Sequence, residues 1–187
     1  MNEKGQAVAV DMLIAVSLFL ILIAVLVTIS SNQNFSEMEN LIQEDMQLEG
    51  QRALNFMVRS QGETTTGETD WESEATLDNI KFFGLAKRDR SITGEKTAKF
   101  IGYAKNSYNN TKEKMLLDYE YYARFLDREG NVIEEPKDTK MEGGKTAVNP
   151  YGIILLKRIV NFEGSEYNGE AIFELRLFRE RPESYEG

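Results

Sequence analysis

A long uncharged run near the N-terminus constrains the fold of this chain more than any other feature. From Gln6 to Ser30 the sequence reads QAVAVDMLIAVSLFLILIAVLVTIS, and Met12 to Ile29 carry no charge. At about 1.5 Å of rise per residue, this run forms a helix of roughly 37 Å, which exceeds the ~30 Å thickness of a bilayer's hydrocarbon core. The run therefore predicts a transmembrane helix, residues 6–30.

A secretory signal peptide is the alternative interpretation of the run. The apolar region of a signal peptide usually spans about 7–15 residues and ends at a small-residue cleavage site, whereas this run is longer and passes Ser30 without an A-x-A pattern. Lys4 precedes the run, and no Lys or Arg follows it until Arg52. The positive-inside rule then predicts a cytoplasmic N-terminus and an extracellular remainder, residues 31–187.

The composition argues against several classes of function. The 187 residues include neither His nor Cys, so the usual general base, the thiolate nucleophile and most transition-metal ligand sets are absent. We therefore expect no enzyme, no cofactor and no metal site. The formal net charge of −9 argues against a nucleic-acid partner, because phosphate binding needs a basic surface.

The residues just before the apolar run carry a recognisable pattern. Lys4-Gly5-Gln6 precedes the run, and a lone acid, Asp11, lies at its start. This arrangement resembles the class III signal peptide of archaeal type IV pilin-like proteins, in which a prepilin peptidase cuts between Gly and Gln on the cytoplasmic side. The resemblance implies that cleavage between Gly5 and Gln6 removes a leader, residues 1–5, and leaves the apolar helix on the mature protein.

Asp11 departs from that pattern by one position. Related families usually carry an acid five residues into the mature chain, whereas Asp11 would be the sixth. Two interpretations stay open: Asp11 acts in assembly by pairing with a neighbouring subunit's amine, or it is an acid at the membrane edge that interacts favourably with the helix dipole.

A helical rhythm continues beyond the membrane segment, through residues 31–62. Apolar residues recur there mostly every three or four positions: Phe35, Met38, Ile42, Met46, Ala53 and Met57. We expect this amphipathic continuation to pack under a globular head, residues 63–187. Gly62 to Gly67, with three Thr between them, should end the helix.

The head has mixed local patterns. Thr93 is a candidate N-cap for a short helix carrying Phe100, and a second helix is expected from Asn110 to Leu117. Period-two alternation begins at Tyr119 and predicts a strand to Leu126 with a hairpin into Val132-Ile133, before an exposed loop over residues 134–149. Stronger strands over residues 152–162 and 170–179 should pair as an antiparallel hairpin.

The order of short segments in the head also resembles that of a family of archaeal pilin-like proteins. The matching segments are Asp70-Trp71-Glu72, Gly84-Leu85-Ala86, Tyr119-Glu120-Tyr121-Tyr122, Lys157-Arg158-Ile159-Val160 and Gly169-Glu170-Ala171-Ile172-Phe173-Glu174-Leu175. The expected fold is α+β and pilin-like: a long N-terminal helix, half transmembrane and half amphipathic, packed against a small antiparallel sheet of three or four strands.

Other candidate sites are weaker. Acids in expected loops (Asp138, Glu142, Glu163 and Glu166) are interpreted as solvated surface, and an aromatic cluster (Tyr119, Tyr121, Tyr122 and Phe125) as core and cross-strand packing. Asn34 and Asn109 begin N-glycosylation acceptor patterns on the side expected to be extracellular.

These observations predict a structural subunit, a pilin or minor pilin-like protein, of an archaeal surface filament. Its expected partners are copies of itself or related pilins through the N-terminal helix, the prepilin peptidase and the membrane. The expected location is the cell membrane as a single-pass protein, then a cell-surface filament. The alternative is an unprocessed single-pass receptor or accessory protein with an extracellular binding head.

Overall fold

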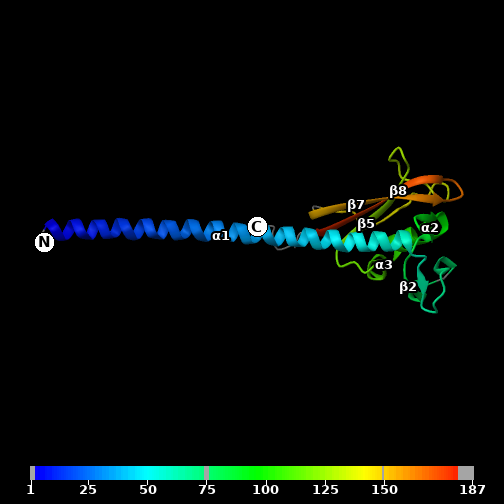
Figure 1. Ribbon diagram of the computed structural model, residues 1–187, viewed down its shortest axis with the longest axis horizontal. Coiled ribbons are helices and arrows are strands. Elements are labelled where there is room, and N and C mark those ends of the chain that lie inside the picture. Colours follow the sequence, from blue (N-terminus) through cyan, green and yellow to red (C-terminus); the bar gives the residue numbers. More distant parts are fainter. Residues whose placement is uncertain (1–2, 74–75, 149, 181–187) are drawn as a thin grey trace. The chain divides into compact units, whose positions relative to one another are not determined.

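The computed structural model describes residues 3–73, 76–148 and 150–180. The chain divides into two compact units, Met1–Ile42 and Gln43–Gly187. Helix α1 runs Glu3–Arg59, so it forms the described part of the first unit and also enters the second. We call the second unit the head, so from here this name covers residues 43–187 and not only the residues 63–187 expected from the sequence. Its other helices are α2, Gly94–Asn106, and α3, Tyr108–Lys114, with 3-10 turns at Trp71–Ser73 and Leu77–Asn79 (Figure 1).

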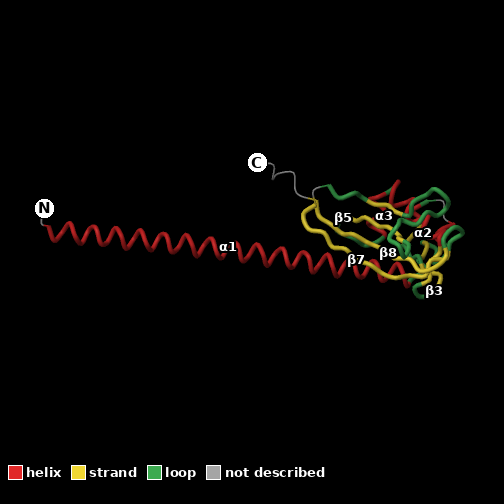
Figure 2. Tube along the Cα trace, turned by 90° about the horizontal axis from the view of Figure 1, so that it is seen from above, coloured by secondary structure: helices red, strands yellow, loops and turns green. Residues whose placement is uncertain are grey.

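The main sheet of the head has six strands in the order β3-β4-β7-β8-β5-β6. Their bounds are β3 Ala86–Arg88, β4 Ser91–Thr93, β5 Glu120–Leu126, β6 Glu142–Gly144, β7 Pro150–Glu163 and β8 Asn168–Glu180. A separate pair joins β1, Glu63–Thr64, to β2, Ile80–Phe82. The long β7–β8 hairpin, which Figure 2 shows beside β5, confirms the strongest strand prediction.

The expected antiparallel sheet of three or four strands is wrong in two respects, because the sheet has six strands and is mixed. β4 pairs with β7 in parallel, with Ser91 opposite Asn161 and Thr93 opposite Glu163. Parallel neighbours need a long crossover, and residues 94–149 supply one. β4 itself is too short to show alternation, since that signal needs about 4–8 residues. The coarser expectation, α+β with a long N-terminal helix and a small sheet, is confirmed.

One stripe of α1 packs against the sheet within the head. Met46, Leu54 and Met57 are each 1% exposed, and Ala53 and Val58 are also buried. Gly50 lies on the same stripe, where a Cβ would stand 2.4 Å from Leu156 Cδ1 and 2.8 Å from Leu177 Cδ1. Glycine therefore permits the close approach of helix and sheet. The expected stripe begins at Met46, because Met38 is exposed, and the side chain of Phe35 lies outside the described part of the chain.

Aromatic side chains fill the core of the head. Phe125 on β5 stacks on Phe173 on β8 with ring centroids 4.4 Å apart, and Phe162 from β7 meets Phe125 edge to face. On α2, Phe100 and Ile101 are buried, and Figure 1 shows α2 beside the sheet. The predicted N-cap is confirmed, since the side chain of Thr93 accepts a hydrogen bond from Lys96 N.

Three boundaries in the head differ from expectation. The second helix, α3, begins at Tyr108 and ends at Lys114, rather than running from Asn110 to Leu117. Val132 makes a single bridge to Leu126 and belongs to no strand. The segment 134–149, expected to be a loop, contains β6 at Glu142–Gly144, whose pairing with β5 is too short to leave a periodic pattern. α1 ends at Arg59, close to the predicted stop at Gly62.

Candidate functional site

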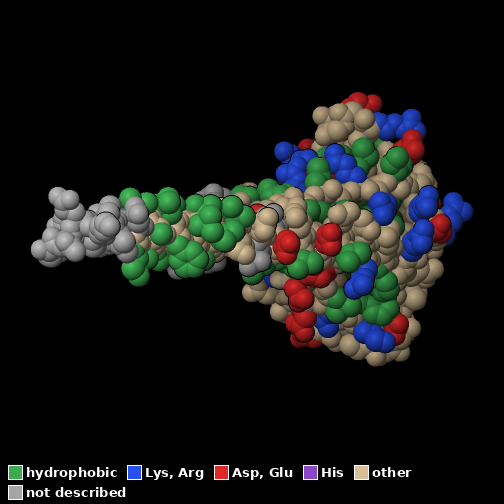
Figure 3. Space-filling view, turned by 60° about the vertical axis from the view of Figure 1, so that its left-hand side comes forward, with side chains coloured by type: hydrophobic (Ala, Val, Ile, Leu, Met, Phe, Trp, Pro, Cys, Tyr) green, Lys and Arg blue, Asp and Glu red, His purple; other side chains and the backbone are tan. Residues whose placement is uncertain are grey.

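The strongest functional feature is the apolar part of α1. Residues 12–33 all have exposed side chains, and Leu13, Phe19 and Leu26 are 68%, 61% and 57% exposed. Figure 3 shows hydrophobic side chains over this stretch, while Lys, Arg, Asp and Glu are drawn on the head. Among the described residues, Met12–Arg59 is the one helical stretch long and apolar enough to cross a membrane. An apolar surface around a whole helix needs lipid or other protein to cover it.

Two hydroxyls lie between Met12 and Ile29, and the helix itself satisfies both. Ser17 Oγ donates to Leu13 O at 2.8 Å, and Thr28 Oγ1 donates to Ala24 O at 2.9 Å. Both bonds reach back four residues, so neither hydroxyl needs water or a partner. In an apolar environment every polar group must find an internal partner. The segment is therefore chemically suited to the interior of a bilayer.

The residues predicted for leader cleavage and assembly belong to α1, and the structure describes only their backbone. Gly5, Gln6 and Asp11 are all helical, as is Asn34 further along. Their side chains lie outside the described part of the structure. The predicted cleavage and the two interpretations of Asp11 therefore stay predictions, and so does glycosylation of Asn34.

Asn109 lies in a helix rather than the surface loop that its acceptor pattern favours. It is exposed near the start of α3. Thr111 of the same pattern is buried, and its hydroxyl donates to Ser107 O at 2.9 Å. The folded head therefore presents the amide of Asn109 but not the hydroxyl of Thr111.

Some of the loop acids and clustered aromatic residues named from the sequence make contacts within the head. Glu142 accepts a hydrogen bond from Tyr122 OH at 2.6 Å, and Glu163 accepts one from Lys87 Nζ at 3.0 Å. Asp138 and Glu166 are exposed, and no group of three or more metal-ligating side chains occurs in residues 12–33, 37–73, 76–148 and 150–180. Within the aromatic cluster, Tyr121 is buried and stacks on Tyr108 with centroids 4.9 Å apart.

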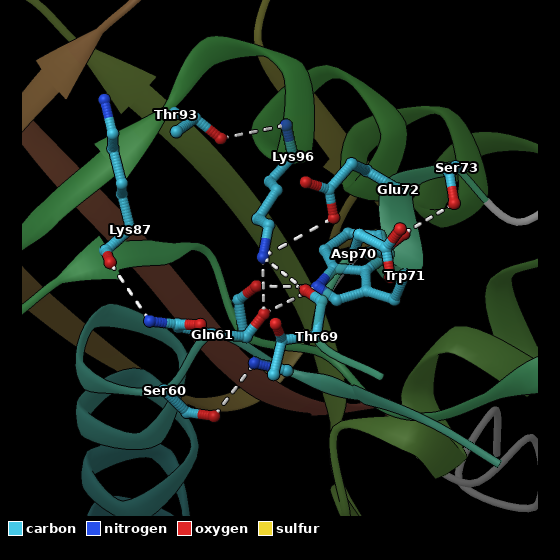
Figure 4. A network of polar contacts seen from close by, with 12 residues as sticks. Ser60, Gln61, Thr69, Asp70, Trp71, Glu72, Ser73, Lys87, Thr93 and Lys96 are labelled. Atoms are coloured by element: carbon cyan, nitrogen blue, oxygen red, sulfur yellow. Dashed lines mark hydrogen bonds and ion pairs between the residues drawn. The ribbon is translucent and has the colours of Figure 1, made fainter. Parts of the chain in front are cut away.

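A polar network closes the C-terminal end of α1 onto the head (Figure 4). Lys96 Nζ donates to Gln61 O and to Thr69 O, both at 2.7 Å, and lies 3.4 Å from Glu72 Oε2. Trp71 Nε1 donates to the same Gln61 oxygen at 3.0 Å and to Gly84 O at 2.8 Å. The Lys96 ammonium thus donates hydrogen bonds to backbone carbonyls just after α1 and in the loop that follows. Sequence reasoning missed this role because Lys96 has no distinguishing motif.

Gly62 fits the same network. Its φ of +78° lies in the left-handed region, and a Cβ there would stand 2.4 Å from Trp71 Nε1. Only glycine combines this backbone conformation with so close a neighbour at little cost. The turn after α1 therefore brings the backbone of residues 61–62 into contact with the indole of Trp71.

A second charged cluster lies on the face of the sheet opposite α1, which we call the outer face. Glu174 on β8 is 1% exposed, and its Oε1 accepts hydrogen bonds from Arg124 Nε at 2.5 Å and Arg176 Nε at 2.9 Å. Lys157 Nζ is 3.2 Å from Glu174 Oε2. Burial alone would raise the pKa of the Glu174 carboxyl, but the three cations outweigh it and hold that pKa below its ordinary value.

The cross-strand register explains why these residues meet. Arg124 on β5 and Lys157 on β7 are both opposite Glu174, and Arg176 is two residues further along β8. Opposite charges at facing positions stabilise neighbouring strands. The sequence could have shown this pairing only if the strand register had been known.

Comparison with known proteins adds no assignment. No model of a protein family matches the chain, and no curated protein or solved structure matches it. The function must therefore be inferred from the exposed apolar helix, the network at its end and the surfaces of the head.

Proposed function

We propose that this chain is a structural subunit, a pilin or minor pilin-like protein, of an archaeal type IV pilus-like surface filament. The observation that carries the proposal is the helix whose residues 12–33 are exposed on every side while residues 46–58 of the same helix pack in the head. Before assembly the apolar segment is anchored in the membrane. In the filament, the same segment is covered by copies of itself or of related pilins.

The chemistry of the segment supports packing against several neighbours rather than one groove. From Met12 to Ile29 apolar side chains surround the helix, so this part of it has no polar face to point at water. Moving one large apolar side chain out of water contributes about 1.5–3 kcal/mol, and lipid or a bundle of identical helices provides that gain equally. Transfer from bilayer to filament core therefore requires no new hydrophobic driving force, only side-by-side packing.

The leader supplies the second support. In our proposal a prepilin peptidase cuts between Gly5 and Gln6, and the apolar helix stays on the mature chain. Cleavage before the apolar run keeps the anchor, whereas cleavage after it would release a secreted head. The head then faces the outside of the cell, consistent with Lys4 before the run and the absence of Lys and Arg from residues 31–51.

The mature N-terminus tests the proposal. Mass spectrometry of the native protein from membranes and from isolated surface filaments should find a chain that begins at Gln6. We expect Gly5→Val to block processing, leaving the protein in the membrane and out of filaments. Glu3→Gln, which also alters the leader but not the scissile bond, is the matched control and should be processed normally.

Other outcomes point elsewhere. An intact N-terminus together with a stable membrane location favours the unprocessed single-pass receptor or accessory protein. A mature form that begins beyond Ser30 would contradict both functions, because the anchor would then be lost.

A further inference from the structure

The outer face of the sheet combines fixed cations with exposed apolar side chains. Strand β7 presents Ile153, Leu155 and Ile159 there, which are 51%, 49% and 64% exposed. Beside Leu155, across the β7–β8 register, stands Arg176. The stripe of α1 packs on the other face of the sheet, so these three β7 side chains are left exposed to solvent.

The charges on this face do not balance. Glu174 is one carboxylate, whereas Arg124, Lys157 and Arg176 are three cations around it. Glu142, opposite Arg124 in the β5–β6 register, is a second carboxylate, so the cluster keeps a formal excess of one positive charge in a chain whose formal net charge is −9. Glu142, the other acid near the arginines, accepts the Tyr122 hydrogen bond. Burial first, and this carboxylate second, raise the pKa of Tyr122 to about 12, so its phenol stays neutral.

Glu174 also sets the orientation of the two arginines. Both use Nε to reach the same oxygen, Oε1, Arg124 from β5 and Arg176 from β8 itself, and Arg176 Nη2 also lies 2.8 Å from that oxygen. A guanidinium has five N–H donors, so each arginine retains donors that Glu174 does not occupy. Holding an arginine in place beforehand reduces the entropy that a ligand must remove on binding.

A hollow lies against these arginines. It is lined by Tyr122, Arg124, Ile153, Leu155, Arg176 and Phe178, and its volume is about 370 Å³. That volume is at the small end of the range for ligand pockets, about 300–1,000 Å³, and suits a body the size of one aromatic ring. Apolar walls with a few fixed polar groups are the usual composition of a small-ligand site.

We propose that this hollow binds an oxyanion carried on a small apolar body. The anionic group pairs with the free N–H donors of Arg124 and Arg176, and the apolar body packs on Ile153, Leu155 and Phe178. Arginine matches both carboxylate and phosphate by paired N–H donors, so either group is accepted by the same residues. A neutral ligand would leave the excess charge unpaired and gain only the apolar contact.

Fluorine NMR on the full chain in detergent tests this site without requiring filaments. The probes are 4-fluorophenylacetate for the carboxylate and 4-fluorophenyl phosphate for the phosphate, with 4-fluorobenzyl alcohol as the neutral comparison and empty micelles as the blank. We expect both anionic probes to broaden and shift in a saturable way, and the alcohol to behave as it does with micelles alone. The failure of this test leaves the proposed filament function untouched, because assembly depends on the apolar helix.

Matched variants locate the binding. Arg176→Gln should weaken both anionic probes about 10-fold to 100-fold, because a charge-assisted hydrogen bond is lost. Arg128→Gln removes the same charge from an exposed ion pair with Glu170 outside the hollow and should leave binding unchanged. Leu155→Ser leaves every charge in place and should weaken binding several-fold. Leu155→Ser also keeps the test informative where Arg176→Gln fails to fold.

Three results would overturn the proposal. The first is no saturable binding of either anionic probe to the wild-type chain. The second is equal weakening by Arg176→Gln and Arg128→Gln, which would reflect net charge alone. The third is binding of the alcohol as tight as that of the anions, which would make the hollow a general apolar site.

Discussion

Two stretches of α1 differ in what buries their apolar side chains. Residues 46–58 of α1 bury one stripe against the head, whereas residues 12–29 are apolar on every side and exposed on every side. The first stretch is stabilised by contacts within the chain, and the second can be covered only by lipid or by other chains. Both stretches are helical, but one is buried by its own chain and the other must be covered from outside it, so changes in the two stretches should affect different measurements.

The largest expected effect follows from charging the apolar stretch. Leu20→Arg combined with Ile23→Arg should release the protein from membranes, because each arginine near the centre of a span costs about 2.5–3.5 kcal/mol, or about 5–7 kcal/mol together. The measurement is the fraction retained in membranes after carbonate extraction, with the thermal unfolding of the head recorded in parallel.

The control for that change is Leu20→Ala with Ile23→Ala, which should stay in the membrane. The unfolding of the head should be the same in all three proteins. Equal membrane retention of the Arg and Ala variants would show that this stretch is not inserted.

A substitution in the buried stripe of α1 should affect the head alone. Met57→Ala truncates a side chain that is 1% exposed and leaves a cavity. It should lower the free energy of unfolding of the head by about 2–5 kcal/mol. Met38→Ala is the same substitution on the same helix at a side chain that is 59% exposed, and it should change that free energy by less than about 0.5 kcal/mol. Denaturant unfolding followed by the fluorescence of Trp71 measures both. Similar losses in the two variants would remove the distinction between the stretches.

The two stretches also differ in how well the sequence predicts them. The apolar run needs no tertiary information, since length and hydrophobicity alone indicate a span. The periodicity of the amphipathic stretch predicts a helix, but among the described side chains the buried stripe begins at Met46, beyond the exposed Met38, because periodicity does not show where the sheet starts. Long strands such as β7 and β8 were found, whereas the three-residue strands β4 and β6 take their pairing from contacts distant in sequence.

The functional residues divide in the same way. The predicted cleavage site between Gly5 and Gln6 rests on adjacent residues, so the sequence alone proposes it. Lys96 and Glu174 acquire their roles from partners distant in the chain: Lys96 from Gln61, and Glu174 from Arg124, which is 50 residues away. Neither residue type is unusual on a surface, so no local pattern distinguishes these two from the other lysines and glutamates.

The network at the end of α1 gives the next effect in size. Lys96→Met removes the ammonium but keeps a side chain of similar length, so the Thr69 carbonyl loses this donor and the Gln61 carbonyl keeps only the one from Trp71 Nε1. We expect the head to lose about 2–3 kcal/mol of unfolding free energy. Lys81→Met removes a lysine whose side chain is 57% exposed, and it should cost less than about 0.5 kcal/mol. Membrane retention should not change in either variant, and a change there would link the two stretches.

Acid titration gives the smallest effect and separates the stretches by their ionisable groups. Residues 12–29 contain none, so retention in the membrane should not depend on pH. In the head, Glu135 accepts hydrogen bonds from Ser165 N at 2.9 Å, Glu166 N at 2.8 Å and Tyr167 N at 3.2 Å. Burial opposes ionisation of this carboxyl, but these bonds and one from the Ser165 hydroxyl outweigh it, so its pKa lies below the ordinary value of 4.5.

The sign of the effect follows from that lowered pKa. Because the unfolded chain takes up the proton at higher pH than the folded one, the contribution of Glu135 is fully present above pH 4.5 and is lost as pH falls through the folded pKa. Glu135→Gln should therefore cost about 1 kcal/mol at neutral pH, and the difference from wild type should shrink on acidification. Glu134→Gln, the same substitution at an exposed neighbour, should change the free energy of unfolding by less than about 0.5 kcal/mol. A constant gap between wild type and Glu135→Gln from pH 7 to pH 3 would show that the carboxylate charge does not hold the β7–β8 loop.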